Sequence, residues 1–450
     1  MEPEPSVLAR VTRFTLDLAP DQIPPETREF AALLLLDTLG ICAAAAPMQA
    51  AGIAREMTAA LHGAGTPDHA ARMLFDGRTV SLAGAVFAAA TQIDNLDGHD
   101  GYNPTKGHIG VVTVPTLAAL AEHLPDLGGT AALAALIVGY EVAGRAGIAL
   151  HATVPEYHTS GAWNALGVVA MVARLRGLTP AQLREGLGIA EYHGPRSQMM
   201  REIATPTMLH DGSGWGALAG MSAALMAEQG FTGAPAVTIE RADAAAHWAD
   251  LGRFWQTDLQ YIKPYPICRW AHAPIDAVRE LCAAHGIAAG DITGIHIRSF
   301  NNAVALWAGM PDHSAQAQYS LPFAVAAHIV HGGIGVQQIT GAGLADTNVA
   351  RLVACTTTEA APEYEARYPE GRWADVTLRL ADGRVLASGE IHARGGPERP
   401  FSRADIIGKY EGFAVPVLGQ SRAFALRDAV LALAQDAPFH DVARQLYQPV

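Results

Sequence analysis

The chain has 450 residues, half of them apolar and 17% charged, with a net charge of −13. This length predicts two or more domains, and a charged fraction below the usual value of about a quarter predicts a large core and an oligomer. The acidic balance argues against a nucleic-acid partner. It does not exclude an anionic substrate, because a cleft can carry local positive charge.

Targeting and redox signals are few. The first residues are acidic and contain proline, so we expect no secretory signal. The most apolar stretch, 30–47, is interrupted by Asp37 and falls short of the roughly 20 residues of a membrane span. We therefore expect a buried helix there, no membrane partner and a cytoplasmic protein. Four separated cysteines without a CxxC pair favour free buried thiols: Cys42, Cys268, Cys282 and Cys355.

Helical patterns dominate the first 230 or so residues. Apolar residues recur at helical spacing, and small residues alternate with large ones, which suits close helix packing. Thr130 and Thr179 are expected N-caps, the latter before Pro180. The predicted helices cover 83–92, 114–122, 130–150, 160–176 and 212–230.

The pattern changes near residue 270. Residues 291–300 alternate like a half-buried strand, and 374–386 form a hairpin candidate with Asp382-Gly383 at its turn. Helical patterns at 273–284 and 320–331 lie between them, and helices return at 402–411 and 421–433. We expect a mainly α protein: a helical main domain (1–268, with 398–450 returning to it) and an inserted α+β lid domain (269–397).

Ionisable residues concentrate in the turn-rich segment 93–110. Its members are Asp94, Asp97, His99, Asp100, Lys106 and His108. A carboxylate can orient an imidazole and hold its pKa near neutrality, which favours acid/base work over a merely solvated loop. Histidine and aspartate also bind metals, but no HExxH-like spacing supports that reading, so we expect no metal.

Three further segments carry polar residues. In 156–164, His158 precedes a helix and is a base at a cleft or a histidine near a capping box. Segment 197–215 contains Arg201, Thr205, Thr207, His210 and Asp211. Segment 261–272 (YIKPYPICRWAH) is a stiff connector in which Lys263 and Arg269 form an anion clamp or belong to a structural hinge.

The sequence lacks the motifs of several enzyme classes. The chain has no GxxxxGK[ST], and no GxGxxG lies between a strand and a helix, so we expect no nucleotide cofactor. GxSxG is also missing, which argues against a serine hydrolase. The expected enzyme uses no cofactor.

Taken in order, these segments resemble the MmgE/PrpD family over nearly the whole chain. That family includes 2-methylcitrate dehydratase, cis-aconitate decarboxylase and iminodisuccinate epimerase. The matching motifs are 36–40 (LDTLG), 94–115, Tyr140-Glu141-Val142 with Arg145, His158, 207–212 (TMLHDG), 263–266 (KPYP) with 275–277, and 320–323 (SLPF).

The resemblance implies a homodimer with a site between its two domains. It implies Asp94, His108, His158 and Lys263 as catalytic residues. His210, Tyr265, Arg201, Arg269, Lys106 and Thr207 are the expected substrate-binding neighbours. Three positions depart from the family pattern: Gly98 replaces a Thr or Ser, Thr207 a lysine, and Phe323 a tyrosine. Lys106 can supply a replacement cation.

The function expected from these residues is a cofactor-independent lyase acting on a small polycarboxylic acid. His158 would remove an α-proton, Lys263 would stabilise the developing negative charge, and His108, oriented by Asp94, would protonate a departing hydroxyl. The same residues would serve an epimerase or a decarboxylase. A catalytically inactive binding homologue is the further alternative, because fold alone does not guarantee function.

Overall fold

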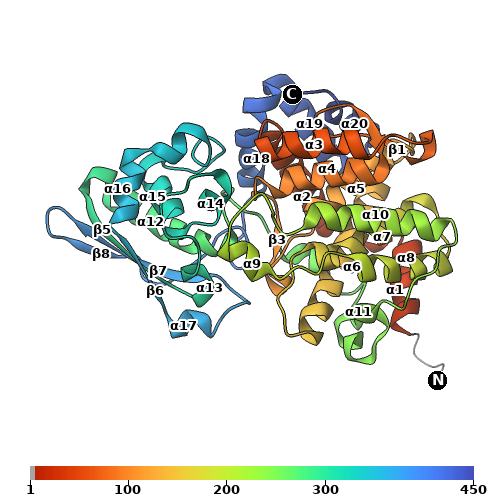
Figure 1. Ribbon diagram of the computed structural model, residues 1–450, viewed down its shortest axis with the longest axis horizontal. Coiled ribbons are helices and arrows are strands. Elements are labelled where there is room, and N and C mark those ends of the chain that lie inside the picture. Colours follow the sequence, from red (N-terminus) through yellow and green to blue (C-terminus); the bar gives the residue numbers. More distant parts are fainter. Residues whose placement is uncertain (1–5) are drawn as a thin grey trace.

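The computed structural model describes residues 6–450, which form two lobes (Figure 1). The main lobe is helical, and its longest helices are α2 (Pro25–Ala45) and α6 (Gly129–Thr153). The second lobe is smaller and places helices against a five-stranded sheet. A mainly helical fold with a smaller α+β part is the fold class that the sequence predicts.

Small residues let the central helices of the main lobe approach closely. Glycines of α6 and α7 (Gly161–Arg176) face each other: a Cβ on Gly167 would lie 2.6 Å from the carbonyl oxygen of Gly139. Alternating small and large side chains allow such ridges to fit into grooves. The other helices and strands of this lobe are α1 (Val7–Asp17), α3 (Gln49–Leu61), β1 (Ala70–Arg72), β2 (Thr79–Ser81), α4 (Leu82–Asp94), β3 (Gly101–Tyr102), α5 (Gly110–Ala121), α8 (Pro180–His193), α9 (Met199–Ala204), α10 (Ser213–Glu228), α11 (Val237–Glu240) and β4 (Gln260–Tyr261).

The C-terminal helices pack on the main lobe rather than on the second one. Helix α18 (Arg403–Leu418) lies along α2, followed by α19 (Gln420–Ala432) and α20 (His440–Leu446) (Figure 1). Lys409 of α18 reaches the buried Asp37 of α2, with its Nζ 2.6 Å from Oδ1. The chain therefore leaves the main lobe, builds the second lobe and returns.

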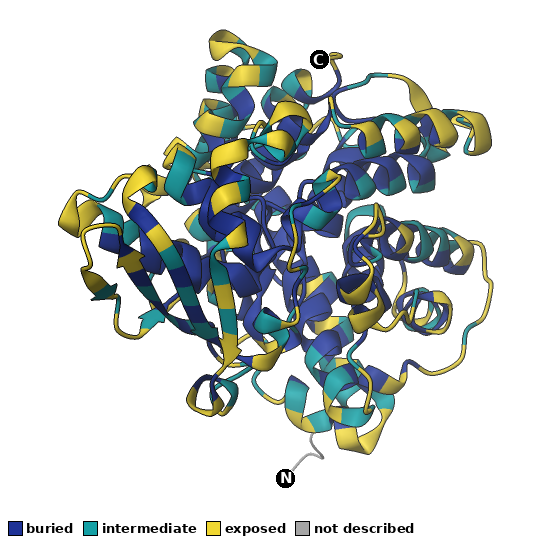
Figure 2. Cartoon of the chain, turned by 60° about the vertical axis from the view of Figure 1, so that its left-hand side comes forward, coloured by how far each residue is buried: buried dark blue, intermediate teal, exposed yellow. Residues whose placement is uncertain are grey.

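The second lobe is built on a mixed sheet with the order β6-β5-β7-β8, and β9 pairs with β7. Strand β5 runs parallel to β6 and antiparallel to β7. Helices α12 and α16 pack on the sheet and α15 packs on these two helices, while the strand edges carry exposed residues (Figure 2). The elements are α12 (His272–His285), β5 (Ile292–Ser299), α13 (Asn301–Val304), α14 (Ser314–Gln318), α15 (Leu321–His331), α16 (Thr347–Ala354), β6 (Thr356–Ala360), α17 (Pro362–Glu365), β7 (Trp373–Leu380), β8 (Val385–Ala387) and β9 (Ile391–His392).

Two local predictions can be compared directly with the structure. The Asp382-Gly383 turn joins β7 to β8, and Gly383 has a φ of +89°, which suits glycine. The N-cap of α6 is Gly128 rather than Thr130. The backbone N–H and hydroxyl of Thr130 instead donate to Oδ1 of Asp436, at 2.9 and 2.7 Å, so a distant carboxylate caps the helix.

The four cysteines are free, with Cys42 and Cys268 buried and the other two half-buried. By length and composition α6 is able to cross a membrane, as is the bent pair of α2 and α3 if counted as one span. However, 94% of the apolar window of α6 is buried inside the protein.

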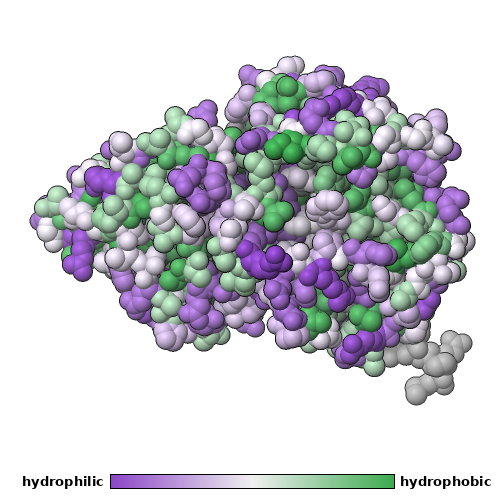
Figure 3. Space-filling view, viewed as in Figure 1, coloured by the Kyte–Doolittle hydropathy of each residue, from purple (hydrophilic) through white to green (hydrophobic). Residues whose placement is uncertain are grey.

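The face drawn in Figure 3 mixes polar and apolar residues, with apolar patches scattered over both lobes. One stripe runs along α3, where Ile53, Met57 and Leu61 are exposed at successive turns. Exposed apolar side chains in a row suit an interface. The homodimer expected from the sequence stays a prediction.

Candidate active site

A short strand pair joins the two most polar segments of the sequence. Gly101 pairs with Tyr261, and Tyr102 with Gln260, which places the Asp-rich loop beside the KPYP connector. A Cβ on Gly101 would lie 2.3 Å from the hydroxyl of Tyr261, so this approach requires glycine. Next to this pair, the ammonium group of Lys263 donates to the carbonyl oxygen of Asp97 at 3.1 Å and also to its carboxylate.

A small enclosed space, the buried cavity, lies where the two lobes meet. Its volume of about 20 Å³ is enough for roughly one water molecule. The main lobe and connector contribute acidic, basic and aromatic side chains, and the second lobe contributes arginine and aromatic ones. The lining residues are Asp97, Lys106, His108, Tyr157, Met199, Asp211, Tyr261, Lys263, Cys268, Arg269, Trp270, Tyr319 and Arg372.

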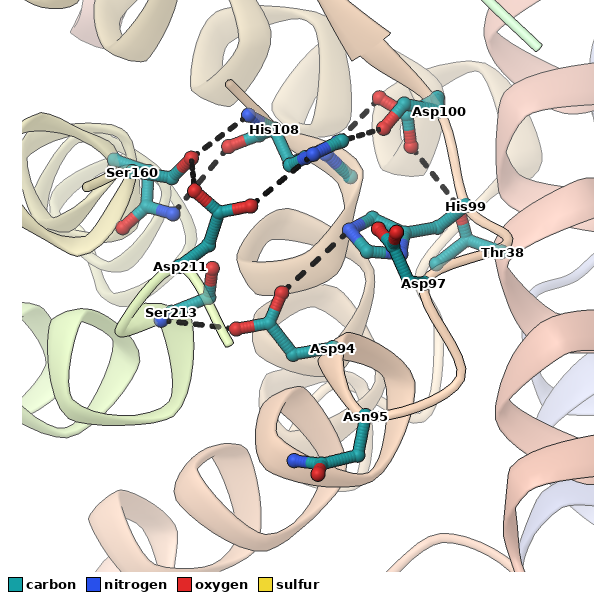
Figure 4. A network of polar contacts seen from close by, with 12 residues as sticks. Thr38, Asp94, Asn95, Asp97, His99, Asp100, His108, Ser160, Asp211 and Ser213 are labelled. Atoms are coloured by element: carbon teal, nitrogen blue, oxygen red, sulfur yellow. Dashed lines mark hydrogen bonds and ion pairs between the residues drawn. The ribbon is translucent and has the colours of Figure 1, made fainter. Parts of the chain in front are cut away.

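His108 is held between two hydrogen-bond acceptors (Figure 4). Its Nδ1 lies 2.7 Å from the carbonyl oxygen of Asp100, and its Nε2 lies 3.2 Å from Oδ2 of Asp211. Burial and the charge of Lys263 lower the pKa of His108, but attraction and hydrogen bonding to Asp211 outweigh them and raise it above its usual value. Because both ring nitrogens face acceptors, the arrangement favours the imidazolium, a proton donor inside a closed space.

Asp211 is fixed from several sides. Its backbone has a φ of +46°, the hydroxyl of Ser160 donates to its Oδ1 at 3.2 Å, and its N–H donates to Glu202 at 2.8 Å. Burial alone would raise the pKa of Asp211, but His108 lowers it below its usual range. The other oxygen of Glu202 accepts from the hydroxyl of Tyr319 at 2.5 Å. The carboxylate facing His108 is therefore ionised and rigidly oriented.

Asp94 does not orient His108, contrary to the expectation from the sequence. Its Oδ2 accepts from the backbone N–H of Ser213 at 3.1 Å, and its Oδ1 lies 3.7 Å from Nε2 of His99 (Figure 4). Burial and the charge of Asp211 raise the pKa of Asp94 well above its usual range, and burial lowers that of His99. The ring of His99 lies 4.5 Å from that of His108, centroid to centroid. Asp94 therefore reaches His108 only through a second histidine.

Eight of the ten expected site residues divide between two spaces. His108, Lys263, Lys106 and Arg269 line the buried cavity. Asp94, Arg201, Thr207 and His210 line a separate hollow of about 740 Å³, the outer cleft, which also includes Glu202. Tyr265 lines neither space. Its hydroxyl donates to Oδ1 of Asp276 at 3.3 Å and accepts from Arg394 at 3.1 Å, and the substrate-binding role expected for it stays a prediction.

His158 also lies outside the residues that line the two spaces. Its backbone N–H donates to Nε2 of His151 at 3.3 Å, and its buried Nδ1 has no hydrogen-bond partner. The neighbouring Tyr157 lines the buried cavity instead. The base role expected for His158 stays a prediction.

The three departures from the family pattern have structural settings. A Cβ on Gly98 would lie 2.7 Å from Cδ1 of Ile41, so this loop is tightly packed. Thr207 is exposed in the outer cleft, where its hydroxyl accepts from the N–H of Leu209 at 3.2 Å. Phe323 is fully buried in α15, whereas the hydroxyl of Tyr319 lies at the buried cavity. Phe323 itself is not among the residues that line this space.

The sequence assigned a site role to only four of the residues that line the buried cavity, and Tyr157, Asp211, Tyr319 and Arg372 are among those it did not select. Asp211 lies in the polar segment 197–215, two residues before Ser213, the first residue of α10. That position was the signal in the sequence that could have identified it. Arg372 stands directly before β7 and has no local motif. Across residues 6–450, no three His, Cys, Asp or Glu side chains are grouped so that they would hold a metal ion.

These features define a two-lobed, mainly helical protein with a buried acid/base pair at the seam between its lobes. Sequence comparison identifies the family. The profile of the MmgE/PrpD N-terminal domain matches residues 9–254, and that of the MmgE/PrpD C-terminal domain matches 265–435. The chain belongs to the MmgE/PrpD family.

Two curated relatives cover nearly the full length. A cis-aconitate decarboxylase of Aspergillus terreus is 23% identical over 474 residues, spanning 95% of this chain and 93% of the relative. A cis-aconitate decarboxylase of Aspergillus terreus (strain NIH 2624 / FGSC A1156) matches with the same identity and coverage. An identity of 23% supports a related enzyme. The particular reaction has to be inferred from the residues of the site.

Proposed function

We propose that this protein is a cofactor-independent lyase acting on a small polycarboxylic acid. The observation that carries the proposal is His108, held as a proton donor between the Asp100 carbonyl and the Asp211 carboxylate inside a cavity with cationic walls. A positioned acid with a pKa near the working pH accelerates reactions that need a proton at the departing or accepting atom. Cations around it would attract carboxylates and stabilise negative charge as it develops.

The first candidate reaction is elimination of water. A base takes the proton from the carbon next to a carboxylate, the electron pair forms a C=C bond, and the C–O bond breaks. His108 gives its proton to the departing hydroxyl, which leaves as water. The base is His158, as expected from the sequence, or one of the two carboxylates that line the cavity, Asp97 and Asp211.

A second candidate, decarboxylation, is favoured by a specific feature: the cavity is lined by a proton donor, but the expected histidine base is not among its lining residues. Decarboxylation needs no proton abstraction. The C–C bond breaks, CO₂ leaves, the electron pair remains on an unsaturated acid, and His108 protonates the carbon. Two relatives that carry the name cis-aconitate decarboxylase make this reaction a direct choice for testing.

Proton NMR in D₂O, after chelator treatment, separates the candidates. The purified chain is incubated in turn with 2-methylcitrate, citrate, cis-aconitate and iminodisuccinate. A new vinyl resonance with loss of an α-proton and no CO₂ supports elimination of water, whereas CO₂ release with deuterium on the product carbon supports decarboxylation. Exchange or inversion without a new product would replace the lyase by an epimerase. If all four acids remained unchanged, the catalytic proposal would fail in favour of a binding homologue.

A further inference from the structure

Three cationic side chains of the buried cavity lie outside the ion pairs of residues 6–450, although the charges of Asp276 and Glu398 act on one of them, Arg269. Lys106, Arg269 and Arg372 all line this space. None of them takes part in an ion pair with a carboxylate in the described part of the chain, residues 6–450. By contrast, Lys263 is paired with Asp97. Arg269 and Arg372 are buried and Lys106 is half-buried. Cations in such positions are usually paired, because removing an unpaired charge from water is unfavourable.

Aromatic rings and backbone carbonyls hold these cations in place without neutralising them. Lys106 lies over the ring of Tyr157 at 4.1 Å, Arg269 over Tyr261 at 4.4 Å and Arg372 over Tyr368 at 4.9 Å. Arg269 donates to the carbonyl oxygens of residues 393 and 394, and Arg372 to those of residues 369 and 371. The Nε atoms of both arginines are buried without a hydrogen-bond partner. The positive charge is therefore fixed and remains available to an anion.

The three cations approach the cavity from both lobes. Lys106 belongs to the Asp-rich loop of the main lobe, whereas Arg372 precedes β7 in the second lobe. The two segments touch, since the side-chain amide of Asn103 donates to the carbonyl oxygen of Glu370 at 3.4 Å. Burial, and next the charge of Arg372, lower the pKa of Lys106, so the two cations oppose each other across the seam. An anion between them would turn this repulsion into attraction.

We propose that Lys106, Arg269 and Arg372 form a carboxylate subsite that is separate from the His108–Asp211 pair. The ligand is then an acid with at least two carboxylates: one is bound by these three cations, while the reacting end lies at His108. This inference rests on the proposed function for the identity of the reacting end. Because the cavity has room for about one water, the lobes separate to admit the acid, and its carboxylate draws the cations together on closure.

Calorimetric binding of two unreactive acids tests the subsite. Glutarate has two carboxylates and butyrate has one, and neither carries a leaving group. We expect wild-type protein to bind glutarate at least about tenfold more tightly than butyrate, as is typical of one charge-assisted contact. In Arg372→Met this preference is expected to disappear, and in Arg372→Lys to return in part. Arg384→Met, which removes an exposed arginine paired with Asp382 in the same lobe, is the matched control and should keep the preference.

Lys106→Met provides a second variant that does not disturb a fully buried side chain, since Lys106 is half-buried. It should weaken glutarate binding and leave butyrate binding unchanged. Equal wild-type affinities for the two acids, no binding of either acid, or an unaltered preference in both variants with intact folding would overturn the subsite. These outcomes are independent of turnover: glutarate preference without any reaction in the NMR assay would retain the subsite and remove the lyase.

Discussion

Replacing Asp211 by asparagine would test the electrostatic basis of the acid/base pair. The substitution keeps the size of the side chain and an oxygen that faces His108, but it removes the charge. Of the influences that remain on His108, burial and the positive charge of Lys263 are the larger ones and lower its pKa, whereas the charge of Asp97 raises it. We therefore expect the pKa of His108 in Asp211→Asn to fall from above its usual value to below it.

The magnitude follows from the separation of the two groups. For unit charges at the observed 3.2 Å and an effective dielectric constant of about 20, the attraction is about 5 kcal/mol. One pKa unit corresponds to about 1.4 kcal/mol, so even a quarter of this attraction shifts the pKa of His108 by about one unit. The basic limb of the pH–rate profile, where His108 loses its proton, should move to lower pH by at least that amount.

The pair also makes stability depend on pH. The pKa of His108 is raised in the folded state, so its contribution is present below the unfolded value of about 6.5 and is lost as pH rises through the folded value. The pKa of Asp211 is lowered, so its contribution is lost as pH falls through that lowered value. Asp211→Asn should therefore reduce the free energy of unfolding more at pH 6 than at pH 9.

The assays are an NMR titration of histidine-labelled protein, with His108 assigned through His108→Gln, and urea unfolding at both pH values. Asp346→Asn is the matched control, because it removes the charge from a half-exposed pair in which His331 Nε2 lies 3.3 Å from the carboxylate. That variant should leave the pH–rate profile unchanged. An unshifted pKa of His108 in Asp211→Asn, or an unshifted basic limb, would refute the electrostatic reasoning.

Three further predictions concern the framework around the site. Lys409→Met leaves the buried Asp37, whose pKa is raised to about 6 by burial, without its cation. Urea unfolding should show that the free energy of unfolding falls by about 3 kcal/mol at pH 7. The loss should be smaller at pH 5, because the carboxyl group of Asp37 then binds a proton. Gly110→Ala brings a Cβ within 2.0 Å of Oδ1 of Asp100, so thermal unfolding and turnover should both report a displaced His108 loop, with about 1–3 kcal/mol lost. Dialysis against a chelator should change neither the melting temperature nor the activity, because no metal-binding group of side chains occurs in residues 6–450; activity restored only by added metal would contradict this.

The helical framework was predictable because its signals are local. Apolar spacing gave α4, α7 and α10 to within a few residues, and Thr179 before Pro180 gave the start of α8, where the capping box is formed. The start of α6 was placed wrongly because its cap comes from Asp436, more than 300 residues away in the chain. A contact of that separation leaves no mark in a local window.

The site was predictable in part for the same reason. His108 and Lys263 lie in segments whose polarity or proline content stands out, and both line the buried cavity. The partner of His108 could not be chosen from sequence, because Asp94, Asp97, Asp100 and Asp211 are equivalent candidates until the chain folds. Arg372 lines the cavity because the two lobes meet there. The residues next to it in the sequence therefore do not indicate that it belongs to the site.

The central claim is that His108 supplies a proton inside the buried cavity, and turnover by His108→Gln tests it most directly. The substrate is the acid identified by NMR, and His123→Gln, which alters a half-buried histidine bonded to the carbonyl oxygen of Ala70, is the control. The account predicts that His108→Gln folds normally and loses about 10²- to 10⁴-fold in kcat, the usual contribution of a positioned acid, while the control retains wild-type turnover. Near-wild-type turnover by folded His108→Gln would contradict the account.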